Sequence, residues 1–526
     1  MKDITGSVYT FEDLIQGNFL YVDKTEYIWQ LVRPAKEMYF LSRPRRFGKS
    51  LTLSTLKAVF QGKKELFKGL AIYDKPYDWK PYPVIQLDMN GRDFSTLEKM
   101  EERFRQILRE QAELNGVSLK EASSDTMFHK LIKTLHDRDG DVVILLDEYD
   151  KPILNNISKP DSRAFLDALK VFYSVIKEKN GMIRLAFITG VSKFCHVSLF
   201  SDLNNLTDIT MDAKYATMLG YTQSEFETSF SEQIEATEKK LNLPRQELLR
   251  KIKNWYDGFR FHADSESVYN PVSLARFFER GGEFSNYWFE TGTPSFLLEL
   301  IMKSKFNYSE MFTEPVSESF FSAFEITRLK PMVLLYQSGY LTIGKCVEEK
   351  IPYTDETIRK YYLNFPNTEV ERAFNNSLLE YCTAIQTESS QEFFSKLITA
   401  VGSGDADGFM KLLQSVFAGI PYNIHVKDEH YYQTVCYVIC DLLNLLVQAE
   451  VCTNNGRIDM MAAAGDWIYV VEFKLNRTAD EAMKQIEHKD YAMKYRKTGK
   501  KIMLLGVNFD FQKGSITDWL REEYSC

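Results

Sequence analysis

The run Val142–Leu146 restricts the fold most, because five successive apolar residues lead directly into Asp147 and Glu148. A strand without polar alternation is buried on both faces, and such strands occur in parallel sheets that carry helices on both sides. Further apolar runs lie at 38–42, 84–89 and 183–189, and they alternate with amphipathic segments at 50–60, 95–114 and 162–179. The sequence therefore predicts an α/β domain built on a parallel sheet.

The length of the chain predicts more than one domain. With 526 residues, and at roughly 150 residues per domain, we expect about three. We place the parallel-sheet domain at 1–220, a mostly helical, aromatic-rich lid or linker region at 221–425, and a C-terminal domain at 426–526. Helices expected in the middle region include 294–303 and 369–386.

The C-terminal domain has a clear order of predicted elements. They are a helix at 428–445, strands at 447–453, 457–463 and 467–475, a helix at 478–497 and a strand at 501–509. This pattern predicts the order α-β-β-β-α-β.

Composition narrows the class of protein. Hydrophobic residues make up 44% of the chain, which is enough for packed cores. The formal net charge of −8 argues against a generally basic nucleic-acid coat, although a local groove can still be positive. The seven cysteines are scattered without a Cys-x-x-Cys pair, and no apolar stretch approaches the roughly 20 residues of a membrane span. We expect a reduced, cytoplasmic protein with no membrane partner.

The segment Arg-Pro-Arg-Arg-Phe-Gly-Lys-Ser at 43–50 is similar to a phosphate-binding loop, which needs Gly-Lys-Ser/Thr between a strand and a helix. Gly48 lets the backbone approach phosphate, and the amides up to Leu51 point at it from the helix N-terminus. Lys49 is expected to neutralise the β- and γ-phosphates, and Ser50 to bind Mg²⁺. The segment predicts ATP as a ligand, with Mg²⁺.

The carboxylates after the apolar run complete this prediction. Asp147 is expected to hold Mg²⁺ through water, and Glu148 to orient or deprotonate the attacking water. The alternative is a charged loop that follows an ordinary strand. The order and context of the two motifs favour nucleotide binding and hydrolysis.

Other polar residues near these motifs are weaker candidates. Thr189 and Ser192 end a neighbouring strand, where they could sense the γ-phosphate or form a simple turn. Arg45 and Arg46 either contact phosphate or pair with carboxylates at the sheet edge. Arg43 stands where the loop pattern has its first Gly, which weakens the motif taken alone.

A second set of charged residues lies in the predicted C-terminal strands. Glu472 and Lys474 share one face of a strand, and the preceding strand can place Asp459 across from them. Two carboxylates with a backbone carbonyl suit Mg²⁺, and Lys474 could position the nucleophilic water. The alternative is a solvated hairpin, but the apolar run at 467–471 makes charges there unusual. These residues predict a metal-dependent nuclease site.

Three further residues could join this site. Glu429 at the start of the preceding helix could contribute to the metal shell, and Gln485 on the following helix could bind backbone phosphate or the water. Tyr491 is a weaker neighbour on the same face.

The chain resembles the bacterial and archaeal proteins that join an AAA-ATPase-like domain to a C-terminal PD-(D/E)xK-superfamily nuclease domain. The likeness covers nearly the full length, through the segments at 21–25, 43–50, 146–150, 200–210, 256–259, 269–271, 456–459 and 472–474. The resemblance implies a restriction-endonuclease-like C-terminal fold, and it implies that Arg43 in place of the first loop Gly is a family trait. The nominal Pro of the nuclease pattern is replaced by Ile458.

The sequence thus predicts an ATPase coupled to a metal-dependent nuclease, with ATP and Mg²⁺ as cofactors and nucleic acid as partner, DNA being favoured over RNA. One alternative is a regulatory or signalling NTPase whose nuclease-like domain binds without cutting. Another is an inactive scaffold with nucleotide as a structural ligand. Oligomeric state is left open.

Overall fold

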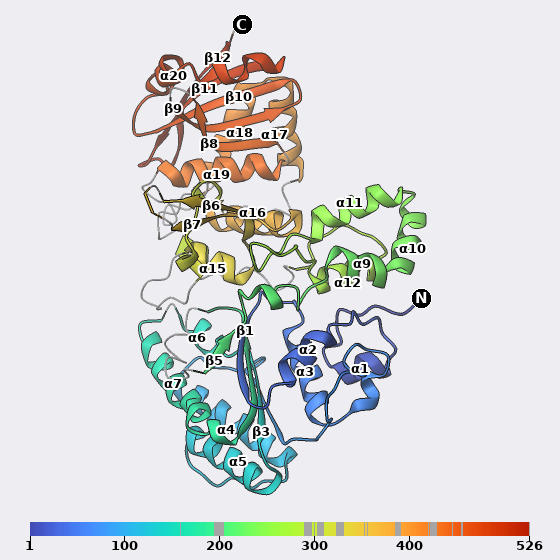
Figure 1. Ribbon diagram of the computed structural model, residues 1–526. Helices are drawn as coiled ribbons and strands as arrows, with labels where there is room; N and C mark the ends of the chain where they lie inside the picture. Colours follow the sequence, from blue (N-terminus) through green and yellow to red (C-terminus); the bar gives the residue numbers. More distant parts are fainter. Residues whose placement is uncertain are drawn as a thin grey trace. The chain divides into compact units, whose positions relative to one another are not determined.

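The computed structural model forms two compact units (Figure 1). Unit 1 comprises Met1–Glu290 and Val316–Val370, and unit 2 comprises Thr291–Pro315 and Glu371–Cys526. The structure describes residues 1–157, 159–193, 205–288, 297–298, 300–301, 310–321, 331–351, 353–354, 356–383, 391–418, 420, 429–443, 445–453 and 456–524. Most of the predicted helix at 294–303, the end of that at 369–386, residue 428 and the motif residues 200–204 lie outside the described residues. The predicted domain boundaries stay predictions.

Unit 1 contains the predicted parallel sheet. Its strands are β1 (Glu37–Ser42), β2 (Val84–Asp88), β3 (Val142–Asp147), β4 (Ile183–Gly190) and β5 (Leu206–Asp208), in the spatial order β2-β3-β4-β1-β5. All paired neighbours are parallel. Every residue of β3 and β4 is buried, as the apolar run predicted. Because β4 lies between β1 and β3, the two phosphate-site motifs flank the end of β4.

Helices cover both faces of this sheet, which confirms the predicted α/β class (Figure 1). The helix α3 (Lys49–Phe60) lies on one face, and α4 (Leu97–Leu114), α5 (Ser124–Asp139) and α7 (Ser162–Glu178) lie on the other. Shorter elements of this part are α1 (Phe11–Gln16), α2 (Thr25–Val32), α6 (Lys151–Leu154), and the 3-10 helices η1 (Lys64–Phe67), η2 (Asn180–Met182) and η3 (Ala213–Tyr215). The helix α5 was not predicted, although its buried Phe128, Leu131, Ile132 and Leu135 recur at helical spacing.

The middle of the chain is mostly helical, as predicted, but it also contains a hairpin. The helices of unit 1 here are α9 (Gln223–Ser229), α10 (Ser231–Leu241), α11 (Arg245–Tyr256), α12 (Pro271–Glu279), η4 (Glu318–Phe321) and α15 (Pro331–Ser338), and the hairpin is β6 (Thr342–Lys350) with β7 (Thr357–Asn364). Phe226, Tyr256, Tyr269 and Phe277 are central to a core in which aromatic rings pack against one another. The aromatic-rich composition of the region therefore has a packing role.

Unit 2 confirms the predicted order α-β-β-β-α-β and adds one strand. Its elements are α14 (Glu310–Thr313), the continuation of α16 (Thr368–Thr383), α17 (Gln391–Ser403), α18 (Ala406–Ala418), α19 (Glu429–Leu442), β8 (Leu446–Thr453), β9 (Gly456–Ala464), β10 (Trp467–Leu475), α20 (Ala479–His488), η7 (Tyr491–Thr498), β11 (Lys501–Asp510) and β12 (Ser515–Tyr524). The sheet order is β12-β11-β10-β9-β8; of the described pairs in this sheet, β10–β11 is parallel and the others are antiparallel. The additional strand, β12, lies at the sheet edge.

The two faces of this sheet pack on different helices. On one face, Val470 and Ile468 join a core with Ile486 of α20 and Tyr491 and Tyr495 of η7. On the opposite face, aromatic side chains pack together. The rings of Tyr432 on α19 and Phe509 on β11 are stacked, with their centroids 4.6 Å apart. The predicted single helix at 478–497 is interrupted, because Asp490 adopts φ 44° and separates α20 from the 3-10 helix η7. No helix among the described residues is long and apolar enough to cross a membrane.

Gly258 tests how closely the middle region packs. It has φ 111°, and a Cβ there would lie 1.8 Å from the carbonyl oxygen of Pro366, whereas a Cβ on Gly69, with φ 83°, would meet nothing within 4 Å. We expect Gly69→Ala to cost about 1–2 kcal/mol from backbone strain alone. Gly258→Ala should cost roughly 3 kcal/mol or more, since the backbone must also move. Urea denaturation of the two variants measures the difference, and equal losses would show that the contact at Pro366 is easily relaxed.

Candidate functional site

The phosphate-loop segment joins β1 to α3 and is shaped by left-handed backbone. Gly48 caps α3 with φ 88°, a conformation that L side chains rarely adopt, and nothing lies within 4 Å of a Cβ built there. The side chain of Lys49 turns back along the loop, and its Nζ donates to the carbonyls of Arg43 and Pro44, both at 2.9 Å. Burial lowers the pKa of Lys49, against the opposing effect of Asp147. The loop is thus closed around a buried cation, with the backbone of Leu51 in the first turn of the helix.

The end of β3 approaches the start of α3. Ser50 Oγ donates to Asp147 Oδ2 at 2.5 Å, although the two residues are 97 positions apart in the chain. Asp147 is 3% exposed. Burial raises the pKa of this carboxyl to about 6, while Ser50 and Lys49 act in the opposite direction. The structure therefore brings together the two residues predicted to hold Mg²⁺ and the predicted phosphate-binding lysine.

Glu148 follows in strained backbone. It has φ 51°, which is uncommon for a residue with a side chain, and its carboxylate pairs with Lys151 at 3.0 Å. Lys151 Nζ also donates to Asn90 Oδ1 at 2.8 Å, beyond the end of β2. The predicted catalytic carboxylate thus stands at the carboxyl edge of the sheet with a cation beside it.

The end of β4 is bound to the end of β3 by a buried carboxylate. Asp150, 1% exposed, accepts hydrogen bonds from the backbone N–H of Val191 and from both the N–H and the hydroxyl of Ser192. Thr189 pairs with Leu41 of β1 and is fully buried, and its hydroxyl has no hydrogen-bond partner among the described residues. Ser192 thus serves the Asp150 contact, whereas the Thr189 hydroxyl is available for another group.

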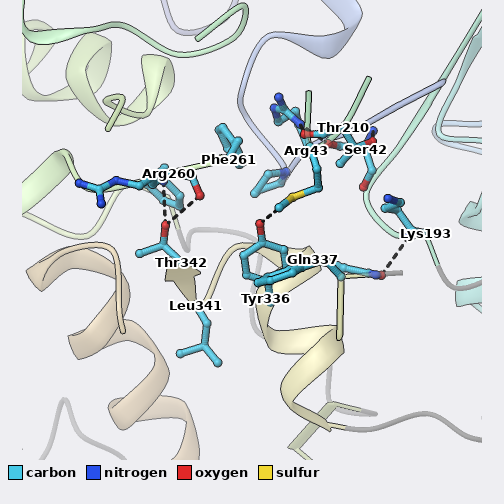
Figure 2. A pocket seen from close by; sticks show the side chains of 14 residues that line it. Ser42, Arg43, Lys193, Thr210, Arg260, Phe261, Tyr336, Gln337, Leu341 and Thr342 are labelled. Carbon is cyan, nitrogen blue, oxygen red and sulfur yellow. Dashed lines mark hydrogen bonds between the residues drawn. The ribbon is translucent and has the colours of Figure 1, made fainter. Parts of the chain in front are cut away.

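Arg43, the residue in place of the first loop Gly, points away from the loop into the protein (Figure 2). Its guanidinium donates to three backbone carbonyls, of Ser42, Thr210 and Tyr215, and lies 4.1 Å from the ring of Phe261. Burial lowers the pKa of Arg43 to about 10. The side chain therefore fastens β1 to the segment after β5 and does not intrude on the phosphate loop.

The pocket beside Arg43 is lined by the middle region as well as by the sheet (Figure 2). Gln337 of α15 accepts a hydrogen bond from the Lys193 backbone N–H at 2.9 Å, and Tyr336 donates to the sulfur of Met211 at 3.2 Å. Thr342 accepts from the backbone N–H of Arg260 at 2.7 Å. These contacts join α15 to the segments that follow β4 and β5, and β6 to the segment that follows α11.

The two other loop arginines also meet the middle region. Arg46 donates to the carbonyl of Tyr287. The side chain of Arg45 is exposed, while its carbonyl accepts from the Trp288 indole at 3.4 Å. Glu369, at the start of α16, accepts from the backbone N–H of Tyr287 at 2.6 Å and of Trp288 at 2.8 Å. The loop, residues 287–288 and the start of α16 therefore form one connected set.

In unit 2, the acidic site comprises Asp459 of β9 and Glu472 and Lys474 of β10. The antiparallel register ends with Val471 opposite Met460, so the next residues along the two strands are Glu472 and Asp459. Asp459 Oδ2 accepts from the N–H of residue 473 at 2.8 Å, and Lys474 Nζ donates to Glu472 Oε1 at 2.9 Å. The structure thus brings the three predicted residues together on the sheet face that also packs against α20.

Burial and like charge shape the electrostatics of the acidic site. Burial, with a further contribution from Glu472, raises the pKa of Asp459 to about 8. Burial also raises the pKa of Glu472, and Glu429 adds to this effect while Lys474 opposes it. Two nearby carboxylates that both resist ionisation would be stabilised by a cation between them.

The predicted accessory residues lie around the acidic site. Glu429 begins α19 and acts electrostatically on both carboxylates. Gln485 of α20 hydrogen-bonds the buried hydroxyl of Tyr491, and this hydroxyl lies 3.1 Å from a Cβ built on Gly456. Burial raises the pKa of Tyr491. Tyr491, predicted only as a weak neighbour, thus connects Gln485 to the acidic site.

The donor set of the acidic site fits a divalent metal ion. Glu472 is 1% exposed, and its Oε2 has no hydrogen-bond partner among the described residues. The carbonyl of Phe473 accepts from Lys474 Nζ at 3.1 Å, so a backbone oxygen lies near the carboxylates. Within the part of the chain that the structure describes, no three His, Cys, Asp or Glu side chains are grouped to hold a metal ion. The fit therefore rests on two carboxylates and a carbonyl.

Comparisons with known proteins also give different families for the part of the chain with the phosphate loop and the part with the acidic site. A family described as predicted AAA-ATPase matches residues 6–200, and the PD-(D/E)XK nuclease superfamily matches residues 427–519. A protein of Azotobacter chroococcum mcd 1, described as an uncharacterized protein in the vnfD 5′ region, is 35% identical over 533 residues and 99% of each chain is covered. The chain belongs to the family of predicted AAA-ATPases with a C-terminal PD-(D/E)XK nuclease-superfamily domain.

Two solved structures show only a weak likeness to this AAA-ATPase-like protein. The Aeropyrum pernix ORC1 protein in complex with DNA has 12% identity and a TM-score of 0.26, covering 69% of this chain and 95% of that one. The Aeropyrum pernix ORC2 protein in ADPNP-ADP complexes has the same identity and TM-score, and 90% of it is covered. Likeness at this level carries no argument about the nucleotide or the nucleic acid.

Some residues that shape the two candidate sites were not predicted. The role of Asp150 was missed, although it follows the predicted carboxylate pair closely. For Arg43 the sequence predicted only a departure from the loop pattern that the resemblance makes a family trait, and the structure shows that it is a buried anchor. Glu369 gave no sequence signal, because its partners are backbone N–H groups of residues 82 and 81 positions away. The predicted roles of the site residues stay predictions.

Glu369 should make unfolding depend on pH. Burial raises the pKa of this carboxyl to about 7 from its ordinary value of 4.5, despite hydrogen bonds from Ser273 and two N–H groups. Since the folded state favours the protonated form, this contribution to stability is complete below about pH 4.5 and is lost as the pH rises through about 7. The full effect is about 3 kcal/mol.

Glu369→Gln should remove this dependence. Thermal unfolding of wild type and variant from pH 5 to 8 measures it: the stability of wild type relative to the variant should fall across this window. Parallel curves would contradict the raised pKa.

Proposed function

We propose that the chain is an ATPase whose nucleotide site comprises Gly48, Lys49, Ser50, Asp147 and Glu148, with residues 1–220 as its ATP-binding domain. The observation that carries the proposal is the hydrogen bond from Ser50 to Asp147 at 2.5 Å, beside the buried ammonium of Lys49. A phosphate-binding lysine, a hydroxyl and a carboxylate at the carboxyl edge of one parallel sheet are what Mg²⁺-dependent phosphoryl transfer needs.

Each residue of the nucleotide site has a role in this proposal. The amides from Gly48 to Leu51 and the ammonium of Lys49 bind the phosphates, while Ser50 and Asp147 hold the ion. Bound Mg²⁺ would offset phosphate charge. Glu148 orients or deprotonates the attacking water. The hydroxyl of Thr189, which has no hydrogen-bond partner within the described part of the chain, supports a role in sensing the γ-phosphate.

The loop arginines have positioning roles in the same proposal. Arg46 donates to the carbonyl of Tyr287, so a change in the loop conformation would move this part of the middle region. The exposed side chain of Arg45 reduces the pKa of Lys49 through charge and is free to approach phosphate from solvent.

A second activity, hydrolysis of phosphodiester bonds, is favoured by the acidic site. The specific observation is the buried Oε2 of Glu472 next to Asp459; this oxygen has no hydrogen-bond partner in the residues that the structure describes. Asp459 and Glu472 would hold Mg²⁺, which would supply charge stabilisation at the scissile phosphate. Lys474 holds the nucleophilic water, Glu429 adds negative charge to the metal shell, and Gln485 with Tyr491 orients the phosphate or the water. The substrate of this activity is a nucleic acid, DNA in preference to RNA.

ATP turnover would control the nuclease activity, through a middle region that responds to the γ-phosphate. The alternative is a regulatory switch whose C-terminal domain binds without cutting. Cleavage that is unaffected by ATP analogues would remove the coupling, and leave two independent activities.

Substitutions at Lys49 and Glu148 should affect ATP binding and ATP hydrolysis separately. Lys49→Ala removes a charge-assisted contact and should weaken ATP·Mg²⁺ binding roughly tenfold to a hundredfold. Glu148→Gln should retain binding and lower the hydrolysis rate by roughly 10²–10⁴. Lys57→Ala, on the same helix α3, is the matched control and should leave both unchanged. Calorimetric titration with ATP and phosphate release measure these effects. Unaltered ATP binding by Lys49→Ala would argue against this nucleotide site.

Cleavage should depend on the acidic site. Glu472→Gln removes a metal-binding charge and should lower Mg²⁺- or Mn²⁺-dependent cleavage by roughly 10² or more. Glu522→Gln is the control: it removes the same charge from an exposed residue of β12 outside the acidic site, and the variant should cleave like wild type. A panel of plasmid, linear and single-stranded DNA and RNA, with and without ATP, measures this. ATP hydrolysis without cleavage of any substrate would support the regulatory switch.

A further inference from the structure

Residues 489–501, here called the basic segment, carry an unusual charge for this chain. They contain six lysines and arginines and one carboxylate, Asp490, in a protein whose formal net charge is −8. The cationic residues are Lys489, Lys494, Arg496, Lys497, Lys500 and Lys501. A local surplus of this kind attracts a polyanion even on an acidic protein.

The packing of η7 turns these charges outward. Tyr491, Ala492 and Tyr495 are buried against the sheet face that carries the acidic site, and they are part of its core. The residues between and after them, including Lys494 and Lys497, are exposed. Because apolar anchors fix the backbone of the segment, its cations are displayed on a fixed surface.

The basic segment begins at the acidic site and leads away from it. The hydroxyl of Tyr491 lies 3.1 Å from a Cβ built on Gly456, three residues before Asp459 on β9, so the first turn of η7 lies beside the acidic site. At the other end, the backbone of Lys501 pairs in register with Trp467, five residues before Glu472 on β10, while its side chain lies over Trp467 on the opposite face of the sheet. At about 3.4 Å per strand residue this separation is about 17 Å. One strand of DNA carries a charge about every 3.4 Å, so the segment spans roughly five phosphates.

Internal pairing accounts for only part of the positive charge. Arg496 approaches Asp490 at 3.5 Å, and Lys500 donates to the Gly465 carbonyl at 2.9 Å. Lys501 lies 5.0 Å from the ring of Trp467, a contact that leaves its charge unneutralised. Lys489 and Lys494 have contacts of their own, and the segment still holds six cations against one carboxylate, with Lys494, Lys497 and Lys500 exposed.

We propose that the basic segment binds the sugar-phosphate backbone of a nucleic acid and presents it to the acidic site. The role of this surface in presenting substrate rests on the proposed nuclease function. Binding of nucleic acid to the basic segment does not itself require cleavage. Contacts of ammonium and guanidinium groups with phosphate carry no base sequence, so the binding is independent of sequence and sensitive to salt.

The test compares two triple variants with equal charge change in the full-length protein. Lys494→Gln/Lys497→Gln/Lys500→Gln removes three exposed cations of the basic segment, and Arg496 is left in place because it contacts Asp490. Lys120→Gln/Lys130→Gln/Lys170→Gln removes three exposed cations from unit 1 as the control. A third variant, Lys494→Arg/Lys497→Arg/Lys500→Arg, keeps the charge and tests whether substitution alone disturbs folding.

Binding of fluorescent single-stranded DNA, duplex DNA and RNA is measured by anisotropy in EDTA, where metal-dependent cleavage does not occur. The glutamine variant of the basic segment should bind at least roughly tenfold more weakly, with the slope of log K against log salt reduced by about 2–3. The control and the arginine variant should behave like wild type. The arms with DNA and RNA distinguish the two sources of the backbone.

Equal affinity and equal salt slope in the two glutamine variants would overturn the proposal, as would wild type that binds none of the three nucleic acids. Binding to vesicles of anionic lipid without binding to nucleic acid would also overturn it. If wild type binds through the basic segment but Glu472→Gln and wild type both fail to cleave, the binding proposal stands and the proposed nuclease function falls.

Discussion

The buried carboxylate of Asp150 is the contact on which the nucleotide site depends. It accepts three hydrogen-bond donors from residues 191 and 192, and so fixes the end of β4 to the end of β3. Gly190 makes the approach possible, since a Cβ there would lie 2.6 Å from both Asp150 and Tyr149. Because β4 lies between β1 and β3, this contact and the strand ladders together set how far the carboxylates of β3 stand from the phosphate loop.

Both candidate sites keep charge in surroundings that disfavour it. Burial lowers the pKa of Lys49 and raises the pKa of Asp147 to about 6 and of Asp459 to about 8. Each of these groups lies beside others that would gain from a bound phosphate or a divalent ion, which would repay part of the desolvation. Arg43 differs, because the NH groups at the end of its guanidinium already donate to three carbonyls and the group lies over an aromatic ring. Desolvation of a buried charge therefore marks a candidate site at Lys49, Asp147 and Asp459, but a structural anchor at Arg43.

Local sequence pattern was enough to predict much of the fold. The apolar run Val142–Leu146 became the fully buried strand β3, and the charged residues at 472 and 474 fell on one face of β10 as alternation requires. Long-range pairing was less accessible. The strand β12 carries several charged residues at the sheet edge, where exposure removes the apolar signal. The break at Asp490 depends on a single backbone angle, which no periodicity reveals.

The sequence by itself determined the element types, the two clusters of reactive residues and the side of each strand on which they lie, because periodicity and turn chemistry act over a few residues. Only the tertiary structure decided that Arg43 turns inward, that Ser50 meets Asp147, and that Glu369 receives the N–H groups of residues 287–288. It also placed the basic segment beside the acidic site. Such contacts join residues far apart in the chain, and they are set by how the sheets and helices pack and not by local preference.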